Sequence, residues 1–491
     1  MDTGDSVRDG VVQNYVDGEW RTPGGDEIPV VNPATGEDLA AVPVSTGADL
    51  DEAVTAARAA YESWREHPVE DRIQPLFAFK QLLEDHQDDI ARVLVQEHGK
   101  TLAEARGELR RGIENVEVAC GIPSMMQAGC LQNAAPNIDE SHVRRPLGVF
   151  AAITPFNFPG MIPLWFLPYA VATGNAFVLK PSEQDPLTAG AIFELVDRAG
   201  FPDGVVQLVH GAADTVNGIL DHDGVTGVSF VGSTPVAEHV YERAAANGKR
   251  VQAQGGAKNH VIVTETADLQ FAAEKTVSSA YANAGERCLA NDVVLVEEGV
   301  YEEFTERLLA CADEQVVGDG LDPETDIGAL ITPEHGERVE AYIESAIEEG
   351  ATTLRDGRGV EVPERPDGTF IGPTVFGDVT PDMRVVREEI FGPVACLAPV
   401  ADLGEAIEWM NGSDFGNAAS LFTGAGADAR RFRHEADVGN LGVNVGTSAP
   451  MAFFNFGGRK GSFYGDLHAQ GEDGVRFYTD KHIYIERWPD A

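Results

Sequence analysis

Short apolar segments alternate with helical segments through the middle of the chain, and this alternation constrains the fold more than any other feature. Their β-branched and apolar residues are typical of buried strands. Strands that alternate with helices predict a doubly wound parallel sheet, because a parallel pair of strands needs a crossover connection, usually a helix. The predicted strands are 149–153, 176–179, 205–209, 228–231 and 260–263.

Other regions flank this sheet. Apolar residues recur at helical spacing from residue 49 to about 126, so long helices are expected there. A second α/β series begins after residue 263 and predicts a second domain in this chain of 491 residues. Its predicted elements are a helix at 268–281, a strand at 292–296 and a helix at 301–312, with further alternation to residue 444. Segments 131–145 and 476–488 alternate like strands outside this α/β body.

The net charge of the chain excludes several kinds of partner. Lys and Arg total 36 and Asp and Glu total 80, which gives a formal net charge of −44. Such a surface repels nucleic acid and anionic membranes. Because 43% of the residues are hydrophobic, we expect a folded chain with acid on its surface. Adaptation to high salt is the plainest account, so molar KCl or NaCl should be needed for full stability.

The cysteines and the apolar segments indicate a cytoplasmic protein. Five cysteines without a CxxC pair argue against a disulfide framework and against a metal site. The acidic residues 1–5 contain no apolar segment of a secretory signal. The most apolar stretch, 161–179, is interrupted by prolines and by Gly174-Asn175, so a buried helix and strand are expected there instead of a membrane span.

Cys288 is the strongest single candidate for chemistry. It follows Arg287 in the turn after a helical segment that ends near Tyr281. A neighbouring cation favours the thiolate, which is the nucleophilic form of cysteine. The alternative is that Cys288 fills space as a small buried hydrophobe.

Four motifs favour the first interpretation, because in this order they resemble the aldehyde dehydrogenase superfamily along nearly the whole chain. They are TPFNFP at 154–159, KPSE at 180–183, NAGERC at 283–288 and EEIFGP at 388–393. The segments GAKNH at 256–260 and GERC at 285–288 resemble the methylmalonate-semialdehyde dehydrogenase branch, which acylates coenzyme A.

The resemblance implies a division of the chain into three parts. An NAD-binding domain is expected from 1–125 and 147–256, and a catalytic α/β domain from 257–472. A small β arm is expected from 126–146 and 473–491. In the family this arm serves oligomerisation, so we expect a homo-oligomer, either a dimer or a homotetramer.

The expected cofactor site lacks both the GxGxxG turn and the GxxxxGK[ST] loop. In their place, Ser233 follows the predicted strand 228–231, where backbone amides and the hydroxyl can bind a pyrophosphate; an ordinary helix cap is the alternative. Glu183 can bind a ribose diol and repel a 2′-phosphate, which favours NAD over NADP. The alternative, from the KPSE motif taken alone, is an exposed ion pair between Lys180 and Glu183. The resemblance assigns to NAD the residues Thr154, Phe156, Lys180, Glu183, Gln184, Ser233, Gly255 and Glu389, with Phe391 beside the nicotinamide.

Hydride transfer from an aldehyde first requires a tetrahedral adduct, which a thiolate supplies as a thiohemiacetal. The resemblance makes Cys288 this nucleophile. It assigns the oxyanion to the Asn157 amide and the Cys288 backbone N–H. Without the other motifs, Asn157 would pass for a turn residue.

Arginines and aromatic residues are expected around the thiol. Arg111 and Arg287 are candidates for bidentate binding of a substrate carboxylate. Arg110 is expected to be a surface ion-pair partner instead. Phe156 and Phe456 are expected to wall the pocket.

Gln254 departs from the hydrolytic members of the family. They have a Glu at the corresponding position, which activates the water that cleaves the thioester, and an amide lacks that basicity. Coenzyme A, whose thiol is intrinsically nucleophilic, is therefore the expected second substrate. The alternative is that Gln254 is a polar filler and another carboxylate is the base.

Together these features predict an NAD-dependent enzyme that oxidises methylmalonate or malonate semialdehyde to propionyl-CoA or acetyl-CoA with release of CO2. A hydrolytic aldehyde dehydrogenase is one alternative. The residue at position 254 distinguishes the two, because hydrolytic members have Glu there and this chain has Gln254. The other alternative is a non-catalytic NAD-binding or structural member, which would be expected to lack Cys288 or Asn157.

Overall fold

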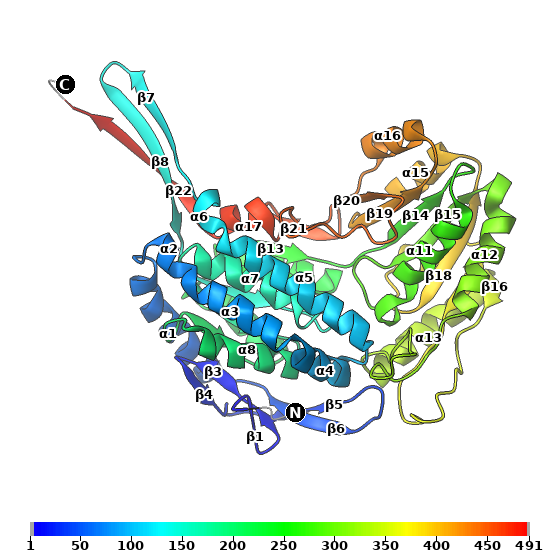
Figure 1. Cartoon of the computed structure of the whole chain (residues 1–491), viewed down its shortest axis with the longest axis horizontal. Coiled ribbons are helices and arrows are strands. Elements are labelled where there is room, and N and C mark those ends of the chain that lie inside the picture. The colour runs from blue at the N-terminus through cyan, green and yellow to red at the C-terminus, as the bar shows by residue number, and fades with distance from the viewer. Residues whose placement is uncertain (1–3, 489–491) are drawn as a thin grey trace.

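Two large sheets covered by helices form the body of the molecule, and a three-stranded arm projects from it (Figure 1). The computed structural model describes residues 4–488. Residues 1–3 and 489–491, with which the predicted first domain begins and the predicted arm ends, lie outside the described residues. The predicted α/β fold with two parallel sheets and a separate β arm is confirmed.

The first sheet has eight strands in the order β21-β13-β12-β9-β10-β11-β3-β4. From β9 the chain continues to β10 and β11 on one side, and then to β12 and β13 on the other side. The direction of strand order therefore reverses between β9 and β12, which is where open α/β sheets bind ligands at the carboxyl ends of their strands. The parallel strands are β9 (Val149–Ile153), β10 (Ala176–Lys180), β11 (Val206–Leu208), β12 (Val225–Val231) and β13 (Arg250–Gln254); the antiparallel edge strands are β21 (Phe463–Gly465), β3 (Asn14–Val16) and β4 (Glu19–Arg21).

Helices cover both faces of this sheet. Helix α7 is apolar on all sides and is buried between the sheet and α5, as a helix without a polar face must be. Within residues 4–488, no helix is long and apolar enough to cross a membrane. The helices are α1 (Gly47–Trp64), α2 (Val69–Arg72), α3 (Gln74–Asp85), α4 (Gln87–His98), α5 (Leu102–Cys120), α6 (Ile122–Met125), α7 (Met161–Ala172), α8 (Leu187–Ala199), α9 (Ala213–Asp221) and α10 (Thr234–Ala246).

The second sheet has seven strands in the order β16-β17-β18-β15-β14-β19-β20. They are β14 (Asn259–Val263), β15 (Asn291–Glu297), β16 (Thr352–Arg355), β17 (Thr374–Gly377), β18 (Val394–Val400), β19 (Ala418–Phe422) and β20 (Asn440–Val443). Its helical segments are α11 (Leu269–Tyr281), the short η1 (Ala282–Gly285) and η2 (Glu298–Val300), α12 (Tyr301–Asp313), α13 (Pro333–Glu348), α14 (Arg384–Arg387), α15 (Leu403–Asn411) and α16 (Gly426–Glu435).

Two strands lie in a different sheet from the one that the sequence suggested. The segment 260–263, predicted in the first sheet, is β14 of the second sheet, because the unpredicted β13 takes its place beside β12. Strand β21 falls within the range 257–472 predicted for the catalytic domain, but it pairs with β13 of the first sheet. The predicted domain boundaries stay predictions.

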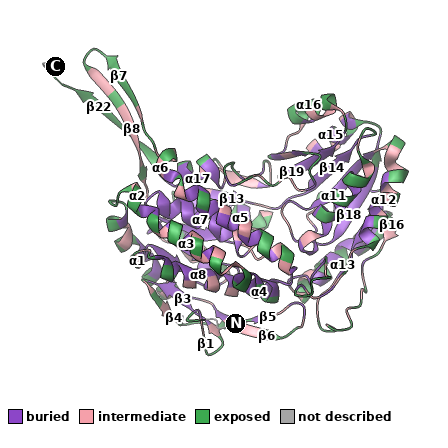
Figure 2. Ribbon diagram, viewed as in Figure 1, coloured by how far each residue is buried: buried purple, intermediate pink, exposed green. Residues whose placement is uncertain are grey.

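The arm consists of β7 (Gly129–Ala135), β8 (Ile138–Pro146) and β22 (Thr479–Arg487). The strand prediction for 476–488 was wrong at its start, because residues 476–477 end helix α17 (Gly471–Phe477). Figure 2 shows that the arm is largely exposed while the two sheets are buried. A small sheet of β1 (Val7–Arg8), β2 (Val11–Val12), β6 (Asp38–Pro43) and β5 (Glu27–Val31) was not predicted.

Candidate active site

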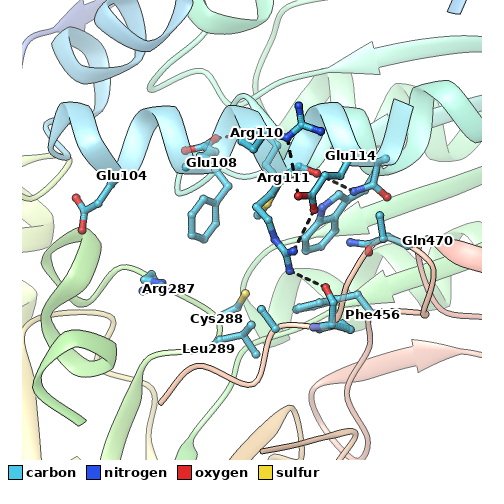
Figure 3. A pocket seen from close by; sticks show the side chains of 18 of the residues that line it. Glu104, Glu108, Arg110, Arg111, Glu114, Arg287, Cys288, Leu289, Phe456 and Gln470 are labelled. Atoms are coloured by element: carbon cyan, nitrogen blue, oxygen red, sulfur yellow. Dashed lines mark hydrogen bonds and ion pairs between the residues drawn. The ribbon is translucent and has the colours of Figure 1, made fainter. Parts of the chain in front are cut away.

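A cavity of about 470 Å³, which we call the thiol pocket, lies where α5 and α7 face the loop that follows η1 (Figure 3). Cys288, Arg287 and Arg111 line it, as does the segment from Ala449 to Phe456. The structure therefore brings together the predicted nucleophile and both predicted carboxylate-binding arginines.

The loop that carries Cys288 has an unusual backbone. Asn283 and Ala284 have φ of 56° and 50°, and Gly285 follows with φ of 76°. A side chain at Gly285 would collide with the carbonyl of Gly392, so the NAGERC and EEIFGP motifs are in direct contact. The Cys288 carbonyl accepts hydrogen bonds from Nδ2 of Asn259 at 2.9 Å and of Asn417 at 2.7 Å, which fixes the loop from the second sheet.

The expectation that a cation holds Cys288 partly as thiolate was wrong for this structure. Burial raises the pKa of the Cys288 thiol to about 12, and the neighbouring Arg287 offsets only part of that effect. The resting nucleophile is therefore a neutral thiol. A change in its surroundings, such as the arrival of substrate or cofactor, is needed before it can react as a thiolate.

Asn157 lies beside the Cys288 loop. Its Nδ2 donates to the carbonyl of Glu286 at 3.1 Å, and the residue is 3% exposed. Its own carbonyl accepts from Nζ of Lys100 at 2.7 Å. The amide thus links the TPFNFP loop to the backbone two residues before the thiol.

Three charged residues at the beginning of α5 hold both loops in place. Lys100 pairs with Glu108 at 2.6 Å, with both side chains inaccessible to solvent. The other oxygen of Glu108 accepts from the backbone N–H of Gly160 at 2.8 Å, at the start of α7. Glu104 accepts from the backbone N–H of Asn283 at 2.6 Å. The sequence analysis did not identify these residues, although Glu104 and Glu108 are four apart and share one helix face.

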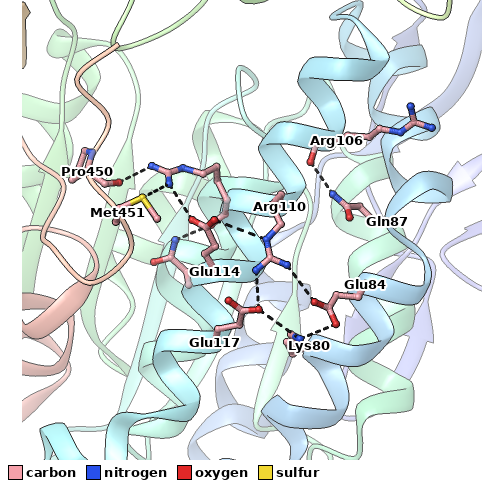
Figure 4. Close-up of polar contacts among 11 residues, drawn as sticks. Lys80, Glu84, Gln87, Arg106, Arg110, Glu114, Glu117, Pro450 and Met451 are labelled. Carbon is pink, nitrogen blue, oxygen red and sulfur yellow. Dashed lines mark hydrogen bonds and ion pairs between the residues drawn. The ribbon is translucent and has the colours of Figure 1, made fainter. Parts of the chain in front are cut away.

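The two neighbouring arginines of α5 share Glu114 but differ in their other partners (Figure 4). Arg110 pairs with Glu84 of α3 at 3.2 Å and with Glu117 at 2.8 Å, and this agrees with its predicted place in an ion-pair network. Arg111 pairs with Glu114 at 3.0 Å and donates to the Pro450 carbonyl at 2.8 Å.

Arg287 differs from both of these arginines. Its guanidinium makes no hydrogen bond or ion pair with any residue among 4–488, and its pKa is lowered by burial. It therefore keeps its donors available for an anion in the thiol pocket.

Aromatic residues close one side of the thiol pocket. Phe456 lines it as predicted, and its ring packs on Trp165 with centroids 4.6 Å apart. Phe156 does not line the pocket, so that prediction was wrong; Phe158 does. The Phe156 ring lies instead 5.8 Å from that of Phe391.

A second group of predicted residues follows the carboxyl ends of β9, β10 and β12; we call it the strand-end site. The hydroxyl of Thr154 is buried without a hydrogen-bond partner in the described chain. Nζ of Lys180 pairs with Glu183 at 2.7 Å. Ser233 stands at the N-cap of α10, but its hydroxyl does not cap that helix. Free hydroxyls and helix amides at the reversal of strand order fit a dinucleotide.

Three further predicted residues surround this site. Glu389 accepts from the backbone N–H of Ala257 at 2.8 Å, and burial raises its pKa to about 7. A Cβ at Gly256 would meet the carboxylate of Glu389, so a larger residue there would displace that side chain. Gly255 donates its N–H to the Ser462 carbonyl, and Gln184 donates its N–H to the Ser182 hydroxyl.

Gln254 ends β13 and is 3% exposed. Neither Oε1 nor Nε2 of its side chain has a hydrogen-bond partner within residues 4–488. A buried amide without partners is costly in a fold, which favours a functional reason for its presence.

The model of the aldehyde dehydrogenase family matches residues 20–483. The chain belongs to this family. Malonate-semialdehyde dehydrogenase 1 of Geobacillus kaustophilus is 50% identical over 479 residues, which covers 97% of this chain and 98% of that protein.

Two solved structures are also very similar to this aldehyde dehydrogenase. The methylmalonate-semialdehyde dehydrogenase of Oceanimonas doudoroffii is 42% identical with a TM-score of 0.97, covering 98% of this chain and 99% of that one. The putative methylmalonate-semialdehyde dehydrogenase of Sinorhizobium meliloti, complexed with NAD, is 39% identical with a TM-score of 0.96, covering 98% of both chains.

Proposed function

We propose that this aldehyde dehydrogenase oxidises malonate or methylmalonate semialdehyde with NAD and transfers the acyl group to coenzyme A, with release of CO2. Full-length relatives that carry these names support the substrate class. The thiol pocket supports it independently, because it combines a thiol with the guanidinium groups of Arg111 and Arg287. An aldehyde that also carries a carboxylate suits both features.

In the proposed reaction, Cys288 attacks the aldehyde carbon after losing its proton, and a thiohemiacetal forms on sulfur. The Asn157 amide and the Cys288 backbone N–H stabilise the oxyanion. Bound NAD would supply the hydride acceptor that converts the thiohemiacetal on Cys288 to a thioester. NAD would be held at the strand-end site by the predicted residues Thr154, Phe156, Lys180, Glu183, Gln184, Ser233, Gly255 and Glu389.

Gln254 carries the acylating part of the proposal. A carboxamide cannot take a proton from water at working pH, so water is a poor nucleophile for the thioester. The thiol of coenzyme A needs less assistance, since thiolates are strong nucleophiles. After oxidation, the β-carboxylate can leave as CO2, because the thioester carbonyl accepts its electron pair. The resulting enolate then takes a proton from water to give the propionyl or acetyl thioester.

The decisive experiment measures NADH formation from methylmalonate semialdehyde with and without coenzyme A. Without it, we expect at most one NADH per active site in a single burst, and sustained turnover only after its addition. Gln254→Glu should add a slow turnover that yields free acid, provided that a water fits beside the new carboxylate. Rapid, sustained formation of free acid by the unmodified protein without coenzyme A would favour the hydrolytic alternative.

We also propose that the protein is a cytoplasmic homo-oligomer, a dimer or a tetramer, assembled through the arm. Leu131, Ile483 and Ile485 of the arm are 63%, 62% and 67% exposed, and apolar residues so exposed on one small sheet are typical of an interface. Light scattering should give two or four chains per particle, whereas a monomer would contradict this assignment.

A further inference from the structure

Gln470 is a buried polar residue of the thiol pocket to which no motif drew attention. It is 3% exposed and lines the cavity beside the segment that carries Phe456 (Figure 3). Its side-chain Oε1 is buried without a hydrogen-bond partner within the described residues 4–488, whereas Nε2 is not among the buried unpaired atoms. A carboxamide in the wall of a cavity can bind a ligand there, and its Nε2 is the atom that would donate to an anion.

The backbone at Gln470 is strained. It has φ of 69° and ψ of 171°, a region that residues other than glycine rarely adopt. Two hydrogen bonds hold the adjoining backbone: the Gln470 carbonyl accepts from the N–H of Gly474 at 2.9 Å, and the N–H of Gly471 donates to the Tyr169 hydroxyl at 3.3 Å. Glycine would fit there without strain, so the presence of a glutamine points to a use for its side chain.

The same contacts connect Gln470 to the predicted carboxylate-binding face of α5. The Tyr169 hydroxyl donates to Oδ1 of Asn115 at 3.2 Å, and Nδ2 of Asn115 donates to the Arg111 carbonyl at 3.1 Å. Arg111 reaches from α5 into the pocket toward the segment with Phe456 (Figure 3). Gln470 and Arg111 both line the thiol pocket, and these hydrogen bonds join the backbone next to Gln470 to the backbone of Arg111.

Arg111 alone is an incomplete site for a carboxylate. Its two terminal nitrogens already donate to Glu114 and to the Pro450 carbonyl, so part of its donor capacity and charge is used within the protein. A carboxylate has about four lone-pair sites and needs further donors when it is removed from water. A neutral amide supplies them without the desolvation cost of another buried charge.

We infer that the Gln470 carboxamide donates hydrogen bonds to the substrate carboxylate beside Arg111 and thereby contributes to the preference for carboxylated aldehydes. This inference rests on the proposed function, since it requires a substrate with a carboxylate. The amide assists binding and takes no part in the covalent steps at Cys288.

The test compares kcat/KM for methylmalonate semialdehyde with kcat/KM for propionaldehyde, which lacks the carboxylate, in the full-length enzyme with NAD and coenzyme A. Gln470→Leu keeps the side-chain size and the backbone strain but removes the amide. We expect the ratio of the two values to fall by about 10- to 100-fold, as is typical when a hydrogen bond to a charged group is lost. Gln81→Leu, the same exchange at an exposed position of α3, is the matched control and should leave the ratio unchanged.

Gln470→Gly distinguishes the effect of losing the side-chain amide from the effect of the strained backbone at this position. It removes the side chain and relaxes the positive φ, so its thermal midpoint should equal or exceed that of the unmodified protein while the substrate ratio still falls by at least about tenfold. A ratio within threefold of the unmodified protein's in both variants would overturn the inference alone. No preference for the semialdehyde in the unmodified protein would overturn the proposed substrate as well.

Discussion

Most of the strand-end site, apart from Glu389, lies at or just after the ends of neighbouring strands, whereas the thiol pocket is built from segments that lie far apart in the chain. Thr154, Lys180 and Ser233 each come within two residues of the end of β9, β10 or β12. The thiol pocket instead needs α5, α7, the loop after η1 and the C-terminal segment around Gln470. The first arrangement follows from sheet topology, and the second depends on long-range packing.

The difference extends to the ion pairs of the two sites. Lys180 and Glu183 are three residues apart, and the Glu183 side chain is 39% exposed. Lys100 and Glu108 are almost equally close, at 2.6 Å, but both are removed from solvent. Loss of either charge would leave the other buried without a counter-charge. The pair therefore stabilises the wall of the thiol pocket.

The largest expected effect separates chemistry from cofactor binding. Cys288→Ala removes the only nucleophile proposed, and we expect turnover to fall on the order of 10⁴-fold or more. NAD affinity should persist, because no strand-end residue is altered. Steady-state NADH formation and calorimetric NAD binding measure the two effects. Substantial remaining activity would show that another residue forms the adduct.

The second prediction compares the two ion pairs directly. Lys100→Met leaves Glu108 buried without its counter-charge, which should lower the free energy of unfolding by about 3–5 kcal/mol. Lys180→Met removes the buried partner of Glu183, whose own side chain is 39% exposed and stays hydrated, so the change should cost at most about 1 kcal/mol. Urea unfolding of both variants gives the comparison.

A double variant controls for the lost lysine packing. Lys100→Met with Glu108→Gln removes both charges but keeps an oxygen that can accept from the Gly160 N–H, so part of the stability should return. Equal losses for Lys100→Met and Lys180→Met would contradict the role assigned to burial.

The same contrast explains what the sequence could predict. The strands β9, β10 and β12 and the residues after them follow from local alternation and short motifs. The sheet that a strand joins is a long-range property, so β14 was assigned to the first sheet and β21 to the second domain. Lys100, Trp165 and Gln470 were missed because nothing in their own neighbourhood marks them. The salt requirement expected from the net charge stays a prediction.

The third prediction concerns the protonation of the thiol. With a pKa of about 12 for Cys288, the thiolate fraction at neutral pH is small and rises tenfold per pH unit. Alkylation of the ligand-free protein by iodoacetamide, followed at Cys288 by mass spectrometry, should therefore accelerate about 100-fold between pH 7 and pH 9. A plateau within that range would mean that Arg287 outweighs burial. Cys130, which is exposed on the arm, provides a comparison within the same sample.

The smallest effect tests the strand-end site alone. The Glu183 carboxylate should repel the 2′-phosphate of NADP, so we expect NAD to be preferred by at least about tenfold in kcat/KM, or roughly 1.4 kcal/mol. Glu183→Gln keeps a hydrogen-bond acceptor for the ribose diol but removes the charge, so the preference should shrink mainly through better use of NADP. Because Glu183 is partly exposed, added salt should narrow the preference of the unmodified protein for NAD over NADP as well.

The pocket variant Gln470→Leu is the control for this prediction. It should leave the ratio of kcat/KM for NAD to that for NADP unchanged, since its effect is confined to the aldehyde. Equal use of NAD and NADP by the unmodified protein would show that Lys180 neutralises Glu183 and that the discrimination lies elsewhere in the first sheet.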